Sequence, residues 1–149
     1  LIHHLAPDWE AAEARAVTNE IKTLHATHGW LWQHHGHAEA NISGTITIDG
    51  REVAASGQID RLVEMADSVV IIDYKTGRHV PANAAEAPLN YRLQLKTYQA
   101  LGQRLYPGKP IRTAILWTHQ CTLMWMDEAV AATPWPPYQD VMLTSPLAA

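Results

Sequence analysis

The sequence contains a single cysteine, Cys121, among its 149 residues. One thiol cannot form an internal disulfide, and it cannot supply an all-cysteine zinc or iron–sulfur site within this chain. The chain also lacks the roughly 18 uninterrupted apolar residues that a membrane-spanning helix requires. No positively charged start followed by an apolar stretch marks a signal peptide. We therefore expect a cytoplasmic protein in reducing surroundings, with no membrane partner.

Basic residues are scarce as well, with 11 Lys and Arg against 15 Asp and Glu, which gives a formal net charge of −4. Proteins that bind DNA gain most of their non-specific affinity from Lys and Arg at phosphates. We therefore expect that a DNA enzyme with this charge balance depends on bound metal ions and on a larger partner that delivers the strand.

The chain is long enough for one folded domain, since such units typically run about 100 to 150 residues. Its hydrophobic fraction of 47% and charged fraction of 17% are typical of a globular protein. The first residue is Leu1 rather than methionine, which we interpret as the sign of a fragment of a larger protein. We expect a single domain with a helical part over residues 1–37, a core over residues 38–126 and a C-terminal tail over residues 127–149.

Local patterns predict the elements of the first half. The segment from Pro7 to about Thr27 is rich in Ala, Glu and Lys and precedes Gly29, which predicts a helix that stops there. From Ala38 onward apolar residues alternate, which predicts a strand. The pair Asp49–Gly50 is typical of a type I′ hairpin turn, and Val53–Glu64 is expected to form the returning strand.

The second half continues with the apolar run Val69–Ile72, which predicts a central strand buried on both faces. Gly77–Pro88 has little periodicity, so we expect a surface loop that contacts substrate. Apolar spacings of three and four predict a helix over Asn90–Tyr106, followed by strands over Ile111–Thr118 and Thr122–Met126 and by an irregular tail. This order favours an α/β fold, an α/β/α sandwich around a mixed central sheet.

Three charged residues stand out in this framework. Asp60 and Asp73 are expected on neighbouring antiparallel strands, so the tight turn at residues 66–68 brings their carboxylates together. Mg²⁺ prefers oxygen ligands, and the main-chain carbonyl of Tyr74 is a candidate for a neutral one. Alternation along the strand places Lys75 on the same face as Asp73, beside the expected metal. There its ammonium group can orient or deprotonate the attacking water and neutralise charge on a phosphate.

These residues also allow a simpler interpretation. Asp73 and Lys75 form a common D-x-K pattern, which a salt bridge at a strand end explains as well, with Asp60 capping a turn. The residues alone leave both interpretations open.

The strings SGQIDRLVE, VVIIDYKTGR and YRLQLKTYQALGQRLYPG, followed by AILWT, fall within residues 38–126. In order and spacing they resemble the nuclease domain of RecB-like proteins in the PD-(D/E)XK superfamily, most closely the C-terminal nuclease of alphaproteobacterial-type AddA. The resemblance implies a restriction-endonuclease-like core and Mg²⁺-dependent hydrolysis of DNA, with Mn²⁺ as a substitute. It also implies exonuclease action in double-strand break repair and recombination, with a helicase motor absent from this chain and an AddB-like partner.

The resemblance also implies roles for single residues. Asp60 and Asp73 match the family's metal-binding aspartates, and Lys75 matches its active-site lysine. Gln94 and Tyr98 match a motif on the following helix, where residues four apart share a face. We expect Gln94 to hold the lysine or the substrate, whereas Tyr98 has core packing as its alternative role.

Two further matches lie upstream. Glu39 corresponds to an acidic residue in the family's first strand, with a solvated strand residue as the alternative. His3 is similar to a metal-ligand histidine of the family, although the segment between it and Glu39 is short for the pattern. An exposed terminal histidine is the alternative there.

The remaining histidines invite a zinc hypothesis, since His25 and His28 are three apart and His34, His35 and His37 are clustered. No cysteine accompanies them and the cluster is expected in a loop, so we interpret them as solvated.

Two alternative functions stay open at this point. One is a catalytically idle DNA-binding or scaffolding module that keeps the nuclease fold, and the other is a structure-specific endonuclease of the same fold.

Overall fold

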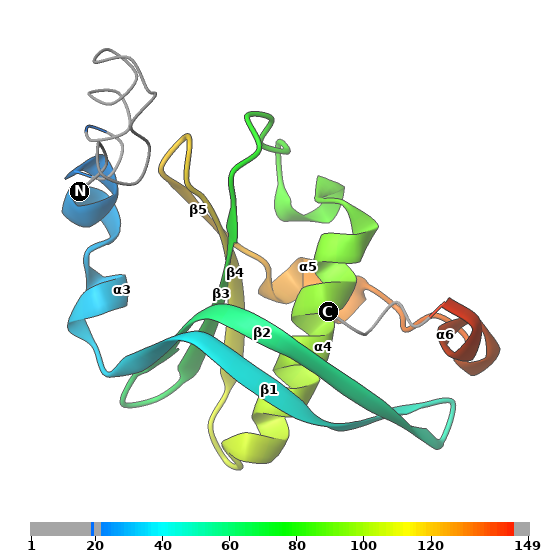
Figure 1. The fold of residues 1–149 in the computed structure, drawn as a ribbon. Coiled ribbons are helices and arrows are strands. Elements are labelled where there is room, and N and C mark those ends of the chain that lie inside the picture. The colour runs from blue at the N-terminus through cyan, green and yellow to red at the C-terminus, as the bar shows by residue number, and fades with distance from the viewer. Residues whose placement is uncertain (1–18, 20–21, 145–149) are drawn as a thin grey trace, which may run out of the picture.

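The computed structural model describes residues 19 and 22–144, and its centre is a five-stranded mixed sheet (Figure 1). The strands are β1 (Gly36–Ile48), β2 (Arg51–Glu64), β3 (Val69–Lys75), β4 (Ile111–Trp117) and β5 (Thr122–Trp125), in this spatial order. Pairing is antiparallel except between β3 and β4, which are parallel. The mixed sheet with flanking helices confirms the predicted fold class.

Helix α4 (Leu89–Leu105) connects the two parallel strands and packs on one face of the sheet. Its buried face meets isoleucines from four strands, because apolar side chains recur on one side of the helix and on alternate positions of each strand. The larger members of this core are Leu95, Tyr98 and Leu101 from the helix and Ile42, Ile46, Ile59, Ile71 and Ile115 from the sheet.

The other face of the sheet carries a smaller core under helix α3 (Trp30–Gln33), where Leu31 is fully buried. Successive side chains of strand β3 point alternately to the two faces of the sheet. Val70 and Ile72 pack in the core on the α3 side, whereas Val69 and Ile71 pack on the α4 side. The same alternation carries Asp73 and Lys75 to the α4 side.

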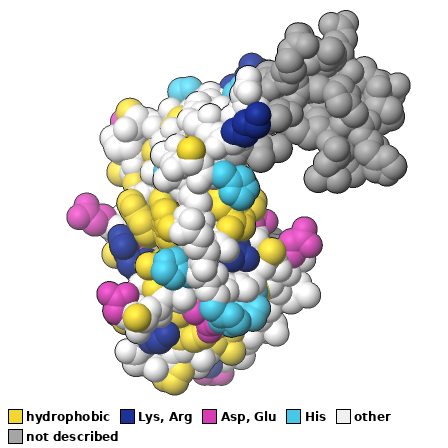
Figure 2. All heavy atoms as spheres, turned by 90° about the vertical axis from the view of Figure 1, so that its left-hand side faces the viewer, with side chains coloured by type: hydrophobic (Ala, Val, Ile, Leu, Met, Phe, Trp, Pro, Cys, Tyr) yellow, Lys and Arg dark blue, Asp and Glu magenta, His cyan; other side chains and the backbone are white. Residues whose placement is uncertain are grey.

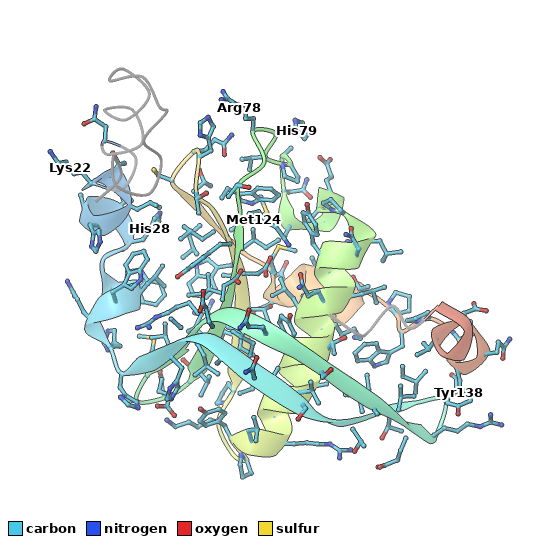
Figure 3. All side chains as sticks on the ribbon, in the orientation of Figure 1. Lys22, His28, Arg78, His79, Met124 and Tyr138 are labelled. Atoms are coloured by element: carbon cyan, nitrogen blue, oxygen red, sulfur yellow. The ribbon has the colours of Figure 1, made fainter. Side chains whose placement is uncertain are left out.

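The β1–β2 hairpin turns at Asp49 and Gly50, whose φ angles of 52° and 72° confirm the expected type I′ turn. Helix α6 (Tyr138–Thr144) lies beside its tip (Figures 1 and 3). The Tyr138 amide donates a hydrogen bond to Asp49 Oδ2 at 2.9 Å, and the Arg51 guanidinium lies 4.7 Å from the ring centre of Tyr138. The C-terminal segment therefore holds the end of the hairpin.

The expectation of an irregular tail was wrong, because α5 (Asp127–Ala132) and α6 follow the sheet. Asp127 and Glu128 in the first turn of α5 favour a helix start, since acidic groups stabilise the positive end of the helix dipole. Helix α6 begins directly after Pro137, and proline is tolerated at helix starts although it disrupts helix interiors. The prolines that precede α6 therefore do not exclude helices here.

The N-terminal part also differs from expectation in detail. A helix over residues 22–28 lies within the predicted one, and the earlier part of that prediction lies outside the described residues except for Asn19, which is helical. Gly29 does not end the helical path, because its φ of −56° keeps it helical and α3 follows. Strand β1 begins at Gly36 rather than Ala38, which moves His37 from the expected loop onto a strand.

Other boundaries agree within three residues, and the expected loop carries a short 3₁₀ helix, Ala84–Glu86, capped by the side chain of Asn83. No helix within the described ranges combines the length and the apolar character that crossing a membrane requires.

Candidate active site

Asp60 and Asp73 meet where the β2–β3 ladder ends. The last backbone pair of this ladder is Arg61 with Ile72, and the next position in the same register sets Asp60 opposite Asp73. Beyond the ladder, a side chain replaces the backbone partner, since the Tyr74 amide donates a hydrogen bond to Asp60 Oδ2 at 2.7 Å. This bond fixes the Asp60 carboxylate beside Asp73.

An irregularity in the hairpin turns Asp60 toward α4. Ile59 and Leu62 both pack in the core on the α4 side although they are an odd number of positions apart, so the alternation of β2 shifts by one residue between them. On the neighbouring strand, Glu39 has a φ of 51°, in the left-handed region, at the same level of the sheet. This irregularity places Asp60 on the face that carries Asp73 and Lys75.

The Lys75 ammonium is held by three groups. Its Nζ lies 2.7 Å from Asp73 Oδ2 and donates a hydrogen bond of 3.5 Å to Gln94 Oε1. It also lies 4.0 Å from the ring centre of Tyr91, where the aromatic face attracts a cation. The three contacts come from β3 and α4, so the β3–α4 packing determines where this charge sits.

A hydrogen-bonded chain continues from Gln94 into the sheet. Gln94 Nε2 donates to the Tyr98 hydroxyl at 3.2 Å, and that hydroxyl donates to the Gln58 carbonyl of β2 at 3.0 Å. Tyr98 is fully buried, and burial raises the pKa of its hydroxyl, so the group stays a neutral donor. The chain fixes which amide atom of Gln94 faces Lys75, because the nitrogen is used by Tyr98.

Asp73 lies in an environment that opposes its charge. Asp73 is 4% exposed, and burial raises the pKa of its carboxyl to about 6. The Lys75 ammonium lowers the pKa, whereas the charge of Asp60 and a hydrogen bond between the two carboxyl groups raise it again. Such an arrangement is typical of functional sites, where carboxylates are brought together for a purpose other than stability.

The Asp73 carboxylate fits a divalent cation. Although Oδ2 is only 2.7 Å from the Lys75 ammonium, it receives no well-directed hydrogen bond from any described residue. A buried carboxylate oxygen normally has such a donor. Two adjacent carboxylates form a donor set of the kind that Mg²⁺ and Mn²⁺ prefer.

The other predicted site residues are placed differently. The side chain of Tyr74 packs on the α3 side of the sheet, away from the carboxylates. Glu39 is exposed, and its main-chain carbonyl accepts a 3.4 Å hydrogen bond from Gln58 Nε2. His3 lies outside the described residues. Contacts thus link Lys75 with Asp73 and Gln94, Gln94 with Tyr98, and Asp60 with the strand that carries Asp73. The role expected for Glu39, which lies opposite Asp60 on the neighbouring strand, stays a prediction.

Sequence reasoning missed two neighbours of Lys75. Tyr91 lies one helical turn before Gln94, and this spacing of three is a usable signal for a shared helix face. Trp117 pairs with Lys75 across the parallel strands, and its ring lies 6.3 Å from that of Tyr91. Its buried indole N–H has no hydrogen-bond partner among the described residues. No local pattern in the sequence predicts that pairing.

A family model described as the PD-(D/E)XK nuclease superfamily matches residues 2–130. The chain belongs to this superfamily. PD-(D/E)XK proteins are typically nucleases that use divalent metal ions. Among solved structures, the chain is similar to one titled "Crystal structure of SSO0001", with 12% sequence identity and a TM-score of 0.46. The match covers 91% of this chain but only 59% of that one. The search of curated proteins gave no significant match.

Proposed function

We propose that this PD-(D/E)XK domain is a metal-dependent nuclease that hydrolyses DNA phosphodiester bonds at the cluster of Asp60, Asp73 and Lys75. The convergence of two carboxylates and one ammonium group carries the proposal. A structural salt bridge would need only Asp73 and Lys75. A second carboxylate beside them is unfavourable unless a cation joins the site.

The roles follow from the geometry. Asp60 and Asp73 would hold Mg²⁺, or Mn²⁺ in its place, with the main-chain carbonyl of Tyr74 proposed as a neutral ligand. A bound ion supplies polarisation of the scissile phosphate and a water of lowered pKa. Lys75, positioned by Gln94 and Tyr91, would orient that water and neutralise charge that develops on the phosphate. His3 is retained as a proposed further ligand.

The loop after β3 is a proposed contact for the substrate. It begins directly after Lys75, and exposed Arg78 and His79 lie at its far end from the sheet (Figure 3). A guanidinium group at the tip of this exposed loop would be available to contact a backbone phosphate of a bound strand.

We further propose that the domain is the nuclease part of a RecB-like or AddA-like helicase-nuclease, acting as an exonuclease in double-strand break repair and recombination inside the cytoplasm. The three sequence motifs and their spacing support this assignment. The net charge of −4 supports it too, because the domain offers little attraction for DNA on its own. A helicase motor and an AddB-like partner would deliver the strand to the site.

The test is digestion of linear and covalently closed circular DNA by the purified chain with Mg²⁺. We expect slow loss of linear DNA, none in excess chelator, and none with Asp73→Asn, whereas Asp67→Asn in the exposed β2–β3 turn retains activity. Digestion that persists in chelator rejects the mechanism. Binding without any cleavage supports the idle module instead, and nicking of circular DNA supports a structure-specific endonuclease.

A further inference from the structure

A second group of potential metal ligands lies at the C-terminal end of β2, beyond Asp60 of the candidate active site. His35 Nε2 is 2.9 Å from Glu64 Oε2, and His37 Nε2 is 3.9 Å from the same oxygen. One ligand atom from each residue lies within 4.8 Å of the other two. Glu64 is four positions after Asp60, about 13 Å along an extended strand, so the two groups cannot share one ion.

The backbone holds the three residues in place. The Glu64 amide donates a hydrogen bond of 2.8 Å to the His35 carbonyl, and His37 pairs with Leu62 in the β1–β2 ladder. Gly36 lies between the two histidines, and a Cβ at this position would meet the Leu62 carbonyl oxygen at 2.2 Å. The close approach of the strands at Gly36 therefore brings both imidazoles over Glu64.

The histidine rings remain free to adjust. Their side chains are 75% and 52% exposed for His35 and His37, against 24% for Glu64. Their ring centres are 5.4 Å apart in an edge-to-face arrangement, so neither ring blocks the other. Histidine side chains are prominent on the side of the molecule that carries α3 (Figure 2). The exposure leaves further coordination positions open to water.

We propose that His35, His37 and Glu64 form a second metal site that binds a transition-metal ion such as Zn²⁺, separate from the carboxylate pair at Asp60 and Asp73. Two imidazole nitrogens and one carboxylate oxygen suit Zn²⁺, Co²⁺, Ni²⁺ or Cu²⁺ better than Mg²⁺. A bound ion would tie the segment that leads from α3 into β1 to the end of β2. This site does not depend on the proposed nuclease activity.

The test uses Co²⁺ as a spectroscopic substitute for Zn²⁺, with the full chain free of any polyhistidine tag. Visible absorbance is recorded during titration in excess Mg²⁺, which occupies the carboxylate pair, and Zn²⁺ is then added as competitor. We expect one Co²⁺ per chain, displaced by Zn²⁺, and an affinity that falls as the pH is lowered because imidazoles bind metals only when unprotonated.

Five variants locate the ion. His35→Ala, His37→Ala and Glu64→Gln should each weaken Co²⁺ binding by about tenfold or more, the scale seen even for lost outer contacts. His34→Ala, an exposed neighbour outside the group, should leave it unchanged, and so should Asp73→Asn. Circular dichroism checks that each variant is folded.

The opposite results are equally clear. The proposal is overturned if Co²⁺ binding survives Glu64→Gln and His37→Ala in folded protein. It is also overturned if His34→Ala weakens Co²⁺ binding as much as these two substitutions do. A titration in which the only Co²⁺ bound depends on Asp73 overturns it as well. In either case the group is a surface ion pair between histidine and glutamate.

Discussion

The buried carboxyl of Asp73 makes the metal-free domain sensitive to pH. Its pKa is raised from 3.8 to about 6 in the folded chain, so folding favours the protonated form. The free energy of unfolding should therefore decrease as the pH rises from about 4 to about 6, by on the order of 2–3 kcal/mol for this group. Asp73→Asn should remove that decrease and stabilise the metal-free domain at pH 7.

Urea unfolding in the presence of a chelator, at pH 4 and at pH 7, measures this difference. Asp67→Asn is the matched control, since Asp67 is exposed in the turn that precedes β3. A variant at position 73 that is less stable than the original chain at pH 7 would contradict the argument.

Substitutions of Lys75 and of Asp73 should both reduce DNA cleavage, but they should differ in their effect on metal binding. Lys75→Ala removes a positive charge next to the proposed ion, so Mn²⁺ binding should persist while DNA cleavage falls by roughly 10²–10⁴-fold. Asp73→Ala removes a ligand and should abolish both. Calorimetry with Mn²⁺ and cleavage of linear DNA measure the two effects. Near-full cleavage by folded Lys75→Ala would remove this strand from consideration as the active site.

The sequence predicted the part of the site that local geometry determines. Alternation predicted that Asp73 and Lys75 share one face of their strand. Helical spacing predicted that Gln94 and Tyr98 share one face of their helix. Glu64 was not predicted as a neighbour of the histidines, because their contact depends on the register of two long strands. Register is a property of the folded sheet, which no single segment contains.

At the level of elements, the hairpin turn gives a direct test of backbone conformation. Gly50 has a φ of 72°, and a Cβ there would meet no atom within 4 Å. Gly50→Ala should therefore destabilise the domain through backbone strain alone, by about 1–2 kcal/mol. Gly50→Asn should cost less, because asparagine tolerates this conformation. Denaturant unfolding compares the two, and equal effects would show that strain is not the cause.

Elements with strong periodicity were predicted well, and the short helices were not. The strands of the hairpin and α4 have repeated apolar positions, and the structure has them within three residues of the expected bounds. Helices α3, α5 and α6 are at most seven residues long. Helices of that length depend on packing rather than on intrinsic propensity, and α5 does pack against α4 and β4.

For the whole molecule, the charge balance predicts weak binding of DNA. With a net charge of −4, the isolated chain should bind DNA more weakly than about 10⁻⁶ M at physiological salt, the tight end of ordinary non-specific binding. Fluorescence anisotropy with labelled linear DNA, in Ca²⁺ to prevent cleavage, measures this affinity. Tight binding at moderate salt without a partner would show that another feature of the surface supplies the attraction.

The parallel pairing of β3 with β4 has a consequence for folding. All of α4 and its flanking loops separate these strands in sequence, so closing the pair loses loop entropy before its contacts are gained. Asp60, Asp73 and Lys75 all lie on the local β2–β3 hairpin, whereas Gln94 reaches Lys75 only when α4 has packed on the sheet. We therefore expect the two carboxylates to come together early in folding and the ammonium group to be fixed only late. A nascent or partly unfolded chain would then carry the acidic pair without a positioned lysine.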